Sequence, residues 1–162
     1  MIVSNTSPLT CLLKVGRVDL LQRLYGSIAI PTEVAMELDQ AGAVHGDWRD
    51  RLAFVHVVEP VDNDPVVVLL RNQVDAGEAA AIALARRARG ELLIIDDMAG
   101  RRQARQLGLS ITGTVGVVLA AAQAGLVDEP LDVLEELREQ GGLCLSTGFL
   151  AKLRRLLRSS PA

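Results

Sequence analysis

Residues 75–97 read DAGEAAAIALARRARGELLIIDD and contain a helix pattern, a turn and a strand pattern in succession. The alanine-rich stretch after Asp75 predicts a helix to about Arg89, because alanine has the highest helix propensity and Gly90 ends the pattern. The apolar run Leu92–Ile95 predicts a strand buried on both faces, and this strand stops at two acidic residues. A helix followed by a fully buried strand is typical of an α/β fold with a parallel sheet.

The rest of the chain also alternates between short apolar runs and helical patterns. Further strands are expected at residues 2–4, 27–30, 54–58 and 110–112. Helices are expected from residue 8, at 18–24, 31–39, 99–107, from 114, at 131–139 and at 147–158, and segment 66–72 fits either a helix or a strand. A chain of 162 residues is close to the roughly 150 residues of one domain. We therefore predict a single α/β domain over residues 1–158 with a short tail, 159–162.

Composition and charge exclude several classes of protein. Apolar residues make up 49% of the chain, so intrinsic disorder is not expected. The 17 basic and 20 acidic residues leave a net charge of −3, so no overall positive field attracts nucleic acid. The longest apolar run, Val115–Val127, is interrupted by glycine and glutamine and is shorter than the ~20 residues that span a bilayer, so no membrane partner is expected. Cys11 and Cys144 match no metal motif and are expected to be buried free thiols in a reducing cytoplasm.

Acidic and amide side chains follow the predicted strands. Asn5 comes directly after the first strand, and Asp96 and Asp97 end the strand that begins at Leu92. Ligands of open parallel sheets bind beyond the carboxyl ends of the strands. Glu37 and Glu78 belong to helices that could lean over the same edge. Oxygen ligands without His or Cys suit a hard cation such as Mg²⁺ or Mn²⁺, which can clamp phosphate oxygens and activate water.

The same residues also have structural explanations. Asp75 and Glu78 have the spacing of a capping box, and for Glu78 capping and function are equally consistent with the pattern. Glu37 shares one face of its expected helix with Glu33, and the helix dipole favours negative charge toward the start of a helix. One of Asp96 and Asp97 is expected to cap the following helix. Two adjacent carboxylates after a buried strand nevertheless make this edge the best candidate site.

Five short motifs occur in an order that resembles a known family. They are VSNTSPL (3–9), IP (30–31) followed by Glu37, DAGEA (75–79), IIDD (94–97) followed by GR (100–101), and TGTVG (112–116). Together they resemble the DUF3368 family of PIN-like proteins, relatives of the VapC toxins, over residues 2 to about 157. The resemblance implies a three-layer α/β/α fold with a central, mostly parallel sheet. It also implies Mg²⁺- or Mn²⁺-dependent ribonuclease chemistry, often in the toxin of a type II toxin–antitoxin pair.

The resemblance also assigns roles to individual residues. It places the acidic positions of a PIN domain on Asn5, Glu37, Glu78 and either Asp96 or Asp97. Asp97 is preferred because it is closer to the usual Thr-x-Asp pattern, and Asp96 becomes a second ligand or a residue that holds water. The expected catalytic residues are thus Glu37, Glu78 and Asp97, with Asn5 and Asp96 as additional metal ligands.

The resemblance also suggests residues that contact the substrate. Thr6 and Ser7 are expected to organise the loop after the first strand or to bind a phosphate. Arg101 and Arg102 are expected to meet the RNA backbone. The implied partners are an RNA substrate, an antitoxin protein and a second copy of the chain in a homodimer.

Asn5 departs from the general PIN pattern, which has Asp at this position. An amide oxygen can bind a cation but adds no negative charge, so weaker metal binding is expected. Two hypotheses follow. The first is a metal-dependent endoribonuclease that cleaves phosphodiesters by metal-activated water, and the alternative is a PIN-like module with little or no turnover that binds RNA or a protein partner.

Overall fold

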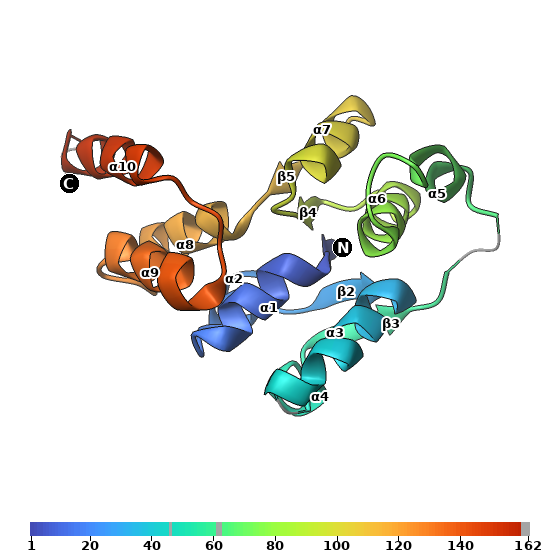
Figure 1. Ribbon diagram of the computed structural model, residues 1–162, viewed down its shortest axis with the longest axis horizontal. Coiled ribbons are helices and arrows are strands. Elements are labelled where there is room, and N and C mark those ends of the chain that lie inside the picture. Colours follow the sequence, from blue (N-terminus) through green and yellow to red (C-terminus); the bar gives the residue numbers. More distant parts are fainter. Residues whose placement is uncertain (46, 61–62, 160–162) are drawn as a thin grey trace.

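The computed structural model describes residues 1–45, 47–60 and 63–159 and contains a parallel sheet at its centre (Figure 1). Within these residues the strands are β1 (Ile2–Ser4), β2 (Ile28–Pro31), β3 (Val55–Val58), β4 (Leu92–Ile94) and β5 (Ile111–Thr112). All neighbouring strands are parallel, in the order β3-β2-β1-β4-β5. The α/β fold with a parallel central sheet is therefore confirmed.

The strand order creates a switch point beside the first strand. The chain adds β2 and β3 on one side of β1 and then returns to add β4 and β5 on the other side. Ser4 is in register with Ile94, so β1 and β4 end at the same level. Ligands of open parallel sheets bind at such a point, outside the carboxyl ends of the strands. This topology brings Asn5 and the Asp96-Asp97 pair to the same edge.

The helices follow the predicted pattern closely. They are α1 (Thr6–Lys14), α2 (Asp19–Tyr25), α3 (Thr32–His45), α4 (Trp48–Arg51), α5 (Pro65–Leu70), α6 (Ala76–Arg87), α7 (Met98–Gln106), α8 (Thr114–Gln123), α9 (Pro130–Glu136), the π-helical turn η1 (Leu137–Gly141) and α10 (Thr147–Ser159). The ambiguous segment 66–72 forms helix α5, because Asp64 accepts a hydrogen bond from the backbone N–H of Val66 and proline occupies the first turn. Helix α4, which was not predicted, is a single turn capped by Asp47.

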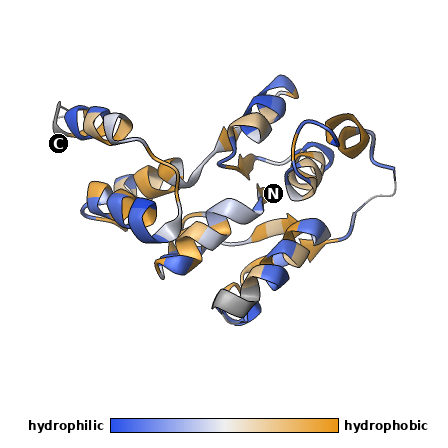
Figure 2. Cartoon of the chain, in the orientation of Figure 1, coloured by the Kyte–Doolittle hydropathy of each residue, from blue (hydrophilic) through white to orange (hydrophobic). Residues whose placement is uncertain are grey.

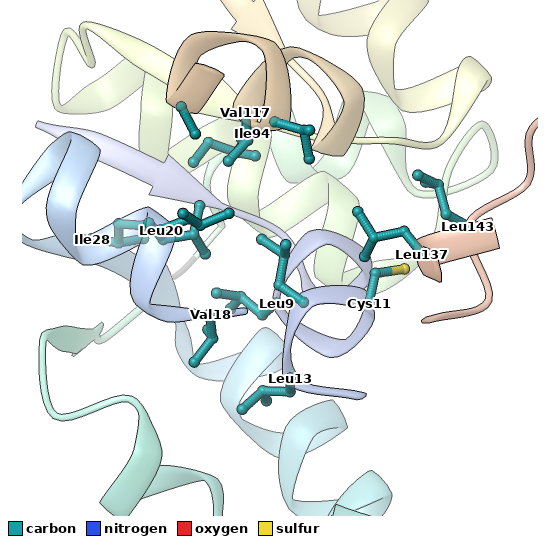
Figure 3. Packing of buried hydrophobic residues seen from close by; sticks show 14 of the residues in the cluster. Leu9, Cys11, Leu13, Val18, Leu20, Ile28, Ile94, Val117, Leu137 and Leu143 are labelled. Atoms are coloured by element: carbon teal, nitrogen blue, oxygen red, sulfur yellow. The ribbon is translucent and has the colours of Figure 1, made fainter. Parts of the chain in front are cut away.

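Apolar side chains cover both faces of the sheet. Ile28 and Ile94 belong to a core with α1, α2, α3, α8 and α9, and Figure 3 shows Leu9 and Val117 packed beside them. Leu93 and Ile95 point to the other face and pack with α6 and with residues of α5 and α7. The alternation along β4 is what a strand buried between two helical layers requires.

Hydropathy follows this layering along the chain (Figure 2). Strand β2 is apolar along its length, whereas α7 is mostly hydrophilic and contains buried positions only at Gly100 and Ala104. Helix α10 stands at one end of the molecule, beyond α8 and α9, in Figure 1. None of the helices in the described ranges is long and apolar enough to cross a membrane.

Cys11 is buried, but the expectation for Cys144 was wrong, because this thiol is exposed in the segment between η1 and α10. Of the predicted tail 159–162, Ser159 belongs to α10, and residues 160–162 lie outside the described part of the chain.

Candidate active site

Asn5 occupies the switch point of the sheet. Its backbone N–H donates to the carbonyl of Ile94 at 3.1 Å, which extends the pairing of β1 with β4 by one residue. Its side chain is 2% exposed, and Oδ1 has no hydrogen-bond partner within the described structure. A buried acceptor without a partner costs about 1–3 kcal/mol, so such an atom is common where a ligand belongs. Asn5 is therefore positioned to offer an oxygen to a bound group.

Glu37 lies between two segments that are distant in sequence. Its Oε2 accepts a short hydrogen bond from the hydroxyl of Thr6, the first residue of α1. Its carboxylate also lies against Gly77 in the first turn of α6. The half-buried Glu37 thereby connects α3 with the start of α1 and the start of α6.

Glu78 has the most perturbed acidity among the site carboxylates. The pKa of its carboxyl group is raised from 4.5 to about 7. Burial is the largest cause, and the negative charges of Asp97, Asp75 and Glu37 contribute the rest of the rise. The backbone N–H of Asp75, which donates to Glu78 Oε2 at 3.4 Å, partly opposes the rise. Of the two explanations that the sequence left open for Glu78, the structure shows the capping box of α6. The charges of Asp97, Asp75 and Glu37 also act on this carboxyl group.

Asp96 and Asp97 have different surroundings. Both oxygens of Asp96 are hydrogen-bonded to Thr114, with Oδ1 2.7 Å from the backbone nitrogen and Oδ2 2.5 Å from the hydroxyl. Asp96 thereby ties the end of β4 to the start of α8. Asp97 is exposed and caps α7, because its Oδ1 accepts from the backbone N–H of Gly100 at 2.8 Å. The negative charge of Asp97 also contributes to the raised pKa of Glu78, whereas Asp96 is not among the causes of that rise.

The proposed substrate-binding residues also differ in their availability. Nη1 of the half-buried Arg101 donates to the carbonyl of Ile95 at 2.8 Å, which directs this guanidinium toward the sheet edge. Arg102 is exposed on α7 and makes no ion pair among the described residues. Ser7 is exposed, whereas the hydroxyl of Thr6 is engaged with Glu37.

The donor set can be tested for its fit to a divalent cation. Oxygen donors alone suit Mg²⁺ or Mn²⁺. A cation would satisfy Asn5 Oδ1 and would offset the burial and the like-charge repulsion that raise the pKa of Glu78. Within the described ranges, however, no group of three or more His, Cys, Asp or Glu side chains converges closely enough to hold a metal. The residues therefore suit a divalent cation in their donor atoms and charge, but the described side chains lie farther apart than the ligands of an assembled metal site.

Sequence reasoning missed two contacts at this edge. Thr114 was expected only to begin a helix, yet it binds both oxygens of Asp96 and is fully buried. Gly77 was expected only as part of a motif, yet Glu37 occupies the space beside it. The short TGT motif and a glycine in a helical first turn were the available signals, but neither identifies its partner without the fold.

Comparisons with known proteins agree with this fold. The family model of DUF3368, described as a PIN domain, matches residues 1–159. Among solved structures, the crystal structure of PAE2754 from Pyrobaculum aerophilum is similar, with a TM-score of 0.51 and 18% sequence identity. The alignment covers 75% of this chain and 89% of that one, and at this identity the likeness concerns the fold. No curated protein matches.

The match covers almost the whole chain and includes every residue of the acidic sheet edge. PIN domains are nuclease-type modules that generally use divalent metal ions, which agrees with the all-oxygen donor set at the ends of β1 and β4. The protein belongs to the DUF3368 family of PIN domains.

Proposed function

We propose that the protein is a divalent-metal-dependent endoribonuclease. The observation that carries the proposal is the environment of Glu78 beside the switch point of the sheet. The pKa of this half-buried carboxyl group is raised to about 7 by burial and by the charges of Asp97 and Glu37. Groups with such perturbed acidity concentrate at functional sites, where burial and neighbouring like charges shift pKa values. The unpartnered amide oxygen of Asn5 lies at the same edge.

Each side chain would have a defined task. Asn5, Glu37, Glu78 and Asp97 would hold Mg²⁺ or Mn²⁺ through oxygen atoms. Such a cation, when bound, lowers the pKa of water and neutralises charge on a phosphodiester. The chain's own contribution is to bring these side chains to one edge of the sheet, where the backbone N–H groups of Gly100 and Asp75 hold the carboxylates of Asp97 and Glu78.

RNA would contact the outer surface of α7. Arg102 and Arg105 are both exposed and form no salt bridge with another described residue. They lie three residues apart on α7, so they share one helix face. Met98, which is 75% exposed, lies at the start of the same helix, next to Asp97. This face is a local basic surface in an acidic protein and can bind backbone phosphates without an overall positive charge.

The test uses mixed RNA substrates with Mn²⁺, with Mg²⁺ and with EDTA. Asp97→Asn removes the charge but keeps an oxygen that can cap α7, so we expect cleavage to disappear while the thermal unfolding midpoint stays the same. Asp47→Asn is the matched control, because Asp47 is also an exposed capping residue, at the start of α4. Metal-independent cleavage, or equal cleavage by the wild type and Asp97→Asn, would contradict the proposal.

A second function is favoured by Asn5, which lacks the charge of the usual aspartate, and by the open arrangement of the carboxylates. In this alternative the domain binds RNA or a protein without turnover. Electrophoretic mobility shifts of RNA by the purified chain, with no cleavage in Mn²⁺, would favour the alternative.

We extend the proposal to the toxin of a type II toxin–antitoxin pair that acts as a homodimer. An antitoxin protein would then bind the chain and block cleavage. Expression of the wild-type chain should arrest growth, and expression of Asp97→Asn should not. Sedimentation of the purified chain as a monomer would contradict the dimer.

A further inference from the structure

Gly77 occupies a position where glycine needs a reason. It is the second residue of α6, and its backbone does not require the left-handed conformation that favours glycine. Glycine is among the least favourable residues in helices because it loses the most backbone entropy. Alanine, which occupies half of the positions in this helix, would favour the helix more.

The space beside Gly77 explains the residue. A Cβ atom added there would lie 2.8 Å from Cδ of Glu37 and 2.9 Å from its Oε2, and closer still to Oε1. Real Cβ atoms do not approach other atoms so closely, so the carboxylate of Glu37 occupies the place of a side chain. The N-terminal turn of a helix also attracts a negative charge through its free N–H groups.

Thr6 holds the same carboxylate from another segment. Its hydroxyl donates to Glu37 Oε2, and Thr6 directly follows Asn5. The carboxylate is therefore held between the first turn of α6 and the first turn of α1, which converge at the carboxyl edge of the sheet.

We propose that Gly77 and Thr6 are positioning residues for Glu37, with Gly77 providing the space and Thr6 the hydrogen bond that together orient its carboxylate. The consequence for metal binding rests on the proposed function, but the contact itself does not. Because the atoms nearest Gly77 are the far end of a flexible side chain, Gly77→Ala is expected to displace Glu37 rather than to unfold the protein.

Gly113 provides a contrast within the same edge. A Cβ atom there would lie 2.7 Å from Asp96 Oδ1 and 2.8 Å from Arg101 Nη1. Those two side chains are tied to Thr114 and to the carbonyl of Ile95, so they cannot move aside as Glu37 can. Substitution at Gly113 should therefore lower the unfolding midpoint more than substitution at Gly77, which costs only the hydrogen bond between Thr6 and Glu37.

The first experiment measures the contact without metal. Thr6→Val removes the hydrogen bond to Glu37 and should lower the thermal unfolding midpoint of the wild type in EDTA. It should have no effect in a Gly77→Ala background, because the displaced carboxylate no longer reaches Thr6. Gly148→Ala is the matched control background, since Gly148 is also the second residue of a helix, α10, and has nothing within 4 Å of its added Cβ. Equal effects of Thr6→Val in both backgrounds would overturn the proposal.

The second experiment measures Mn²⁺ affinity by isothermal titration calorimetry. Gly77→Ala should weaken binding about tenfold, the effect typical of residues that orient metal ligands, and Gly148→Ala should leave it unchanged. In a Glu37→Asp background, whose shorter side chain leaves room for a methyl group, Gly77→Ala should have no further effect. A tenfold loss in both backgrounds would overturn the role in orienting Glu37. If the wild type binds no Mn²⁺, the proposed function fails, and the metal-free experiment alone decides about the contact.

Discussion

The raised pKa of Glu78 predicts a specific dependence of stability on pH in the absence of metal. In the unfolded chain this carboxyl group ionises near 4.5, whereas in the folded protein it holds its proton to about 7. Between these pH values the folded state binds more protons than the unfolded state. The contribution of Glu78 to folding is therefore most favourable below about pH 4.5 and is lost as the pH rises through 7.

The size of the effect follows from the two pKa values. At about 1.4 kcal/mol for each pH unit, a change from 4.5 to about 7 corresponds to an upper bound of about 3 kcal/mol. Glu78 is only half-buried, so water screens part of the interaction, and we expect about 2 kcal/mol. Glu78→Gln keeps an oxygen that can accept from Asp75 and complete the capping box, but it cannot ionise.

The assay is urea unfolding of the wild type and Glu78→Gln in EDTA, at pH 4.5 and at pH 8. We expect equal free energies of unfolding at pH 4.5 and a variant that is more stable by about 2 kcal/mol at pH 8. Glu129→Gln is the control, because Glu129 is exposed and makes no capping bond from its side chain at α9. A difference between the wild type and Glu78→Gln that is the same at both pH values would refute this interpretation of the site.

Three other perturbations have distinct expected outcomes. Asp96→Ala should lower the free energy of unfolding, measured by chemical denaturation, by about 3 kcal/mol, because it leaves two donors of the buried Thr114 unpaired. A loss below about 1 kcal/mol would contradict the hydrogen bonds between Asp96 and α8. Asn5→Asp should destabilise the metal-free protein by about 3 kcal/mol, because it buries a charge, and Mn²⁺ should restore the stability and increase cleavage. Thermal unfolding with and without Mn²⁺ measures this, and a variant whose stability does not respond to Mn²⁺ would argue against a cation at this edge. Burial, with a smaller contribution from the charge of Asp96, raises the pKa of the Cys11 thiol to about 11. Iodoacetamide at pH 8 should therefore add one label, at the exposed Cys144, and mass spectrometry that finds Cys11 labelled in the folded protein would contradict its burial.

Much of the fold was predictable because the local patterns are unambiguous. The segment from Asp75 to Asp97 forms the predicted helix and strand, since alanine-rich sequence and a continuous apolar run each favour one structure. The segment around Val66 remained ambiguous, because periodicity alone does not distinguish a short buried helix from a strand. Its structure was decided by the cap at Asp64 and by packing of Leu70 against the sheet.

The position of the acidic residues at one edge of the sheet was predictable from sequence, but their contacts were not. Asn5 and the Asp96-Asp97 pair could be placed at one edge from sequence, because parallel strands of one sheet end on the same side. The residue pattern alone could not separate Asp96 from Asp97, although the family resemblance favoured Asp97, because the partners of these side chains come from remote segments. Thr114, which lies 18 residues from Asp96, made that distinction in the folded chain.

The amino-acid sequence by itself therefore determined the order of helices and strands, the parallel class of the sheet and the oxygen character of its acidic edge, because these properties depend on local propensity and on residue chemistry. Only the tertiary structure decided which carboxylates face one another, which of them hold the fold together and why Glu78 binds its proton so tightly. Desolvation and charge repulsion depend on distances between segments that are far apart in sequence, and packing of the folded chain alone sets those distances.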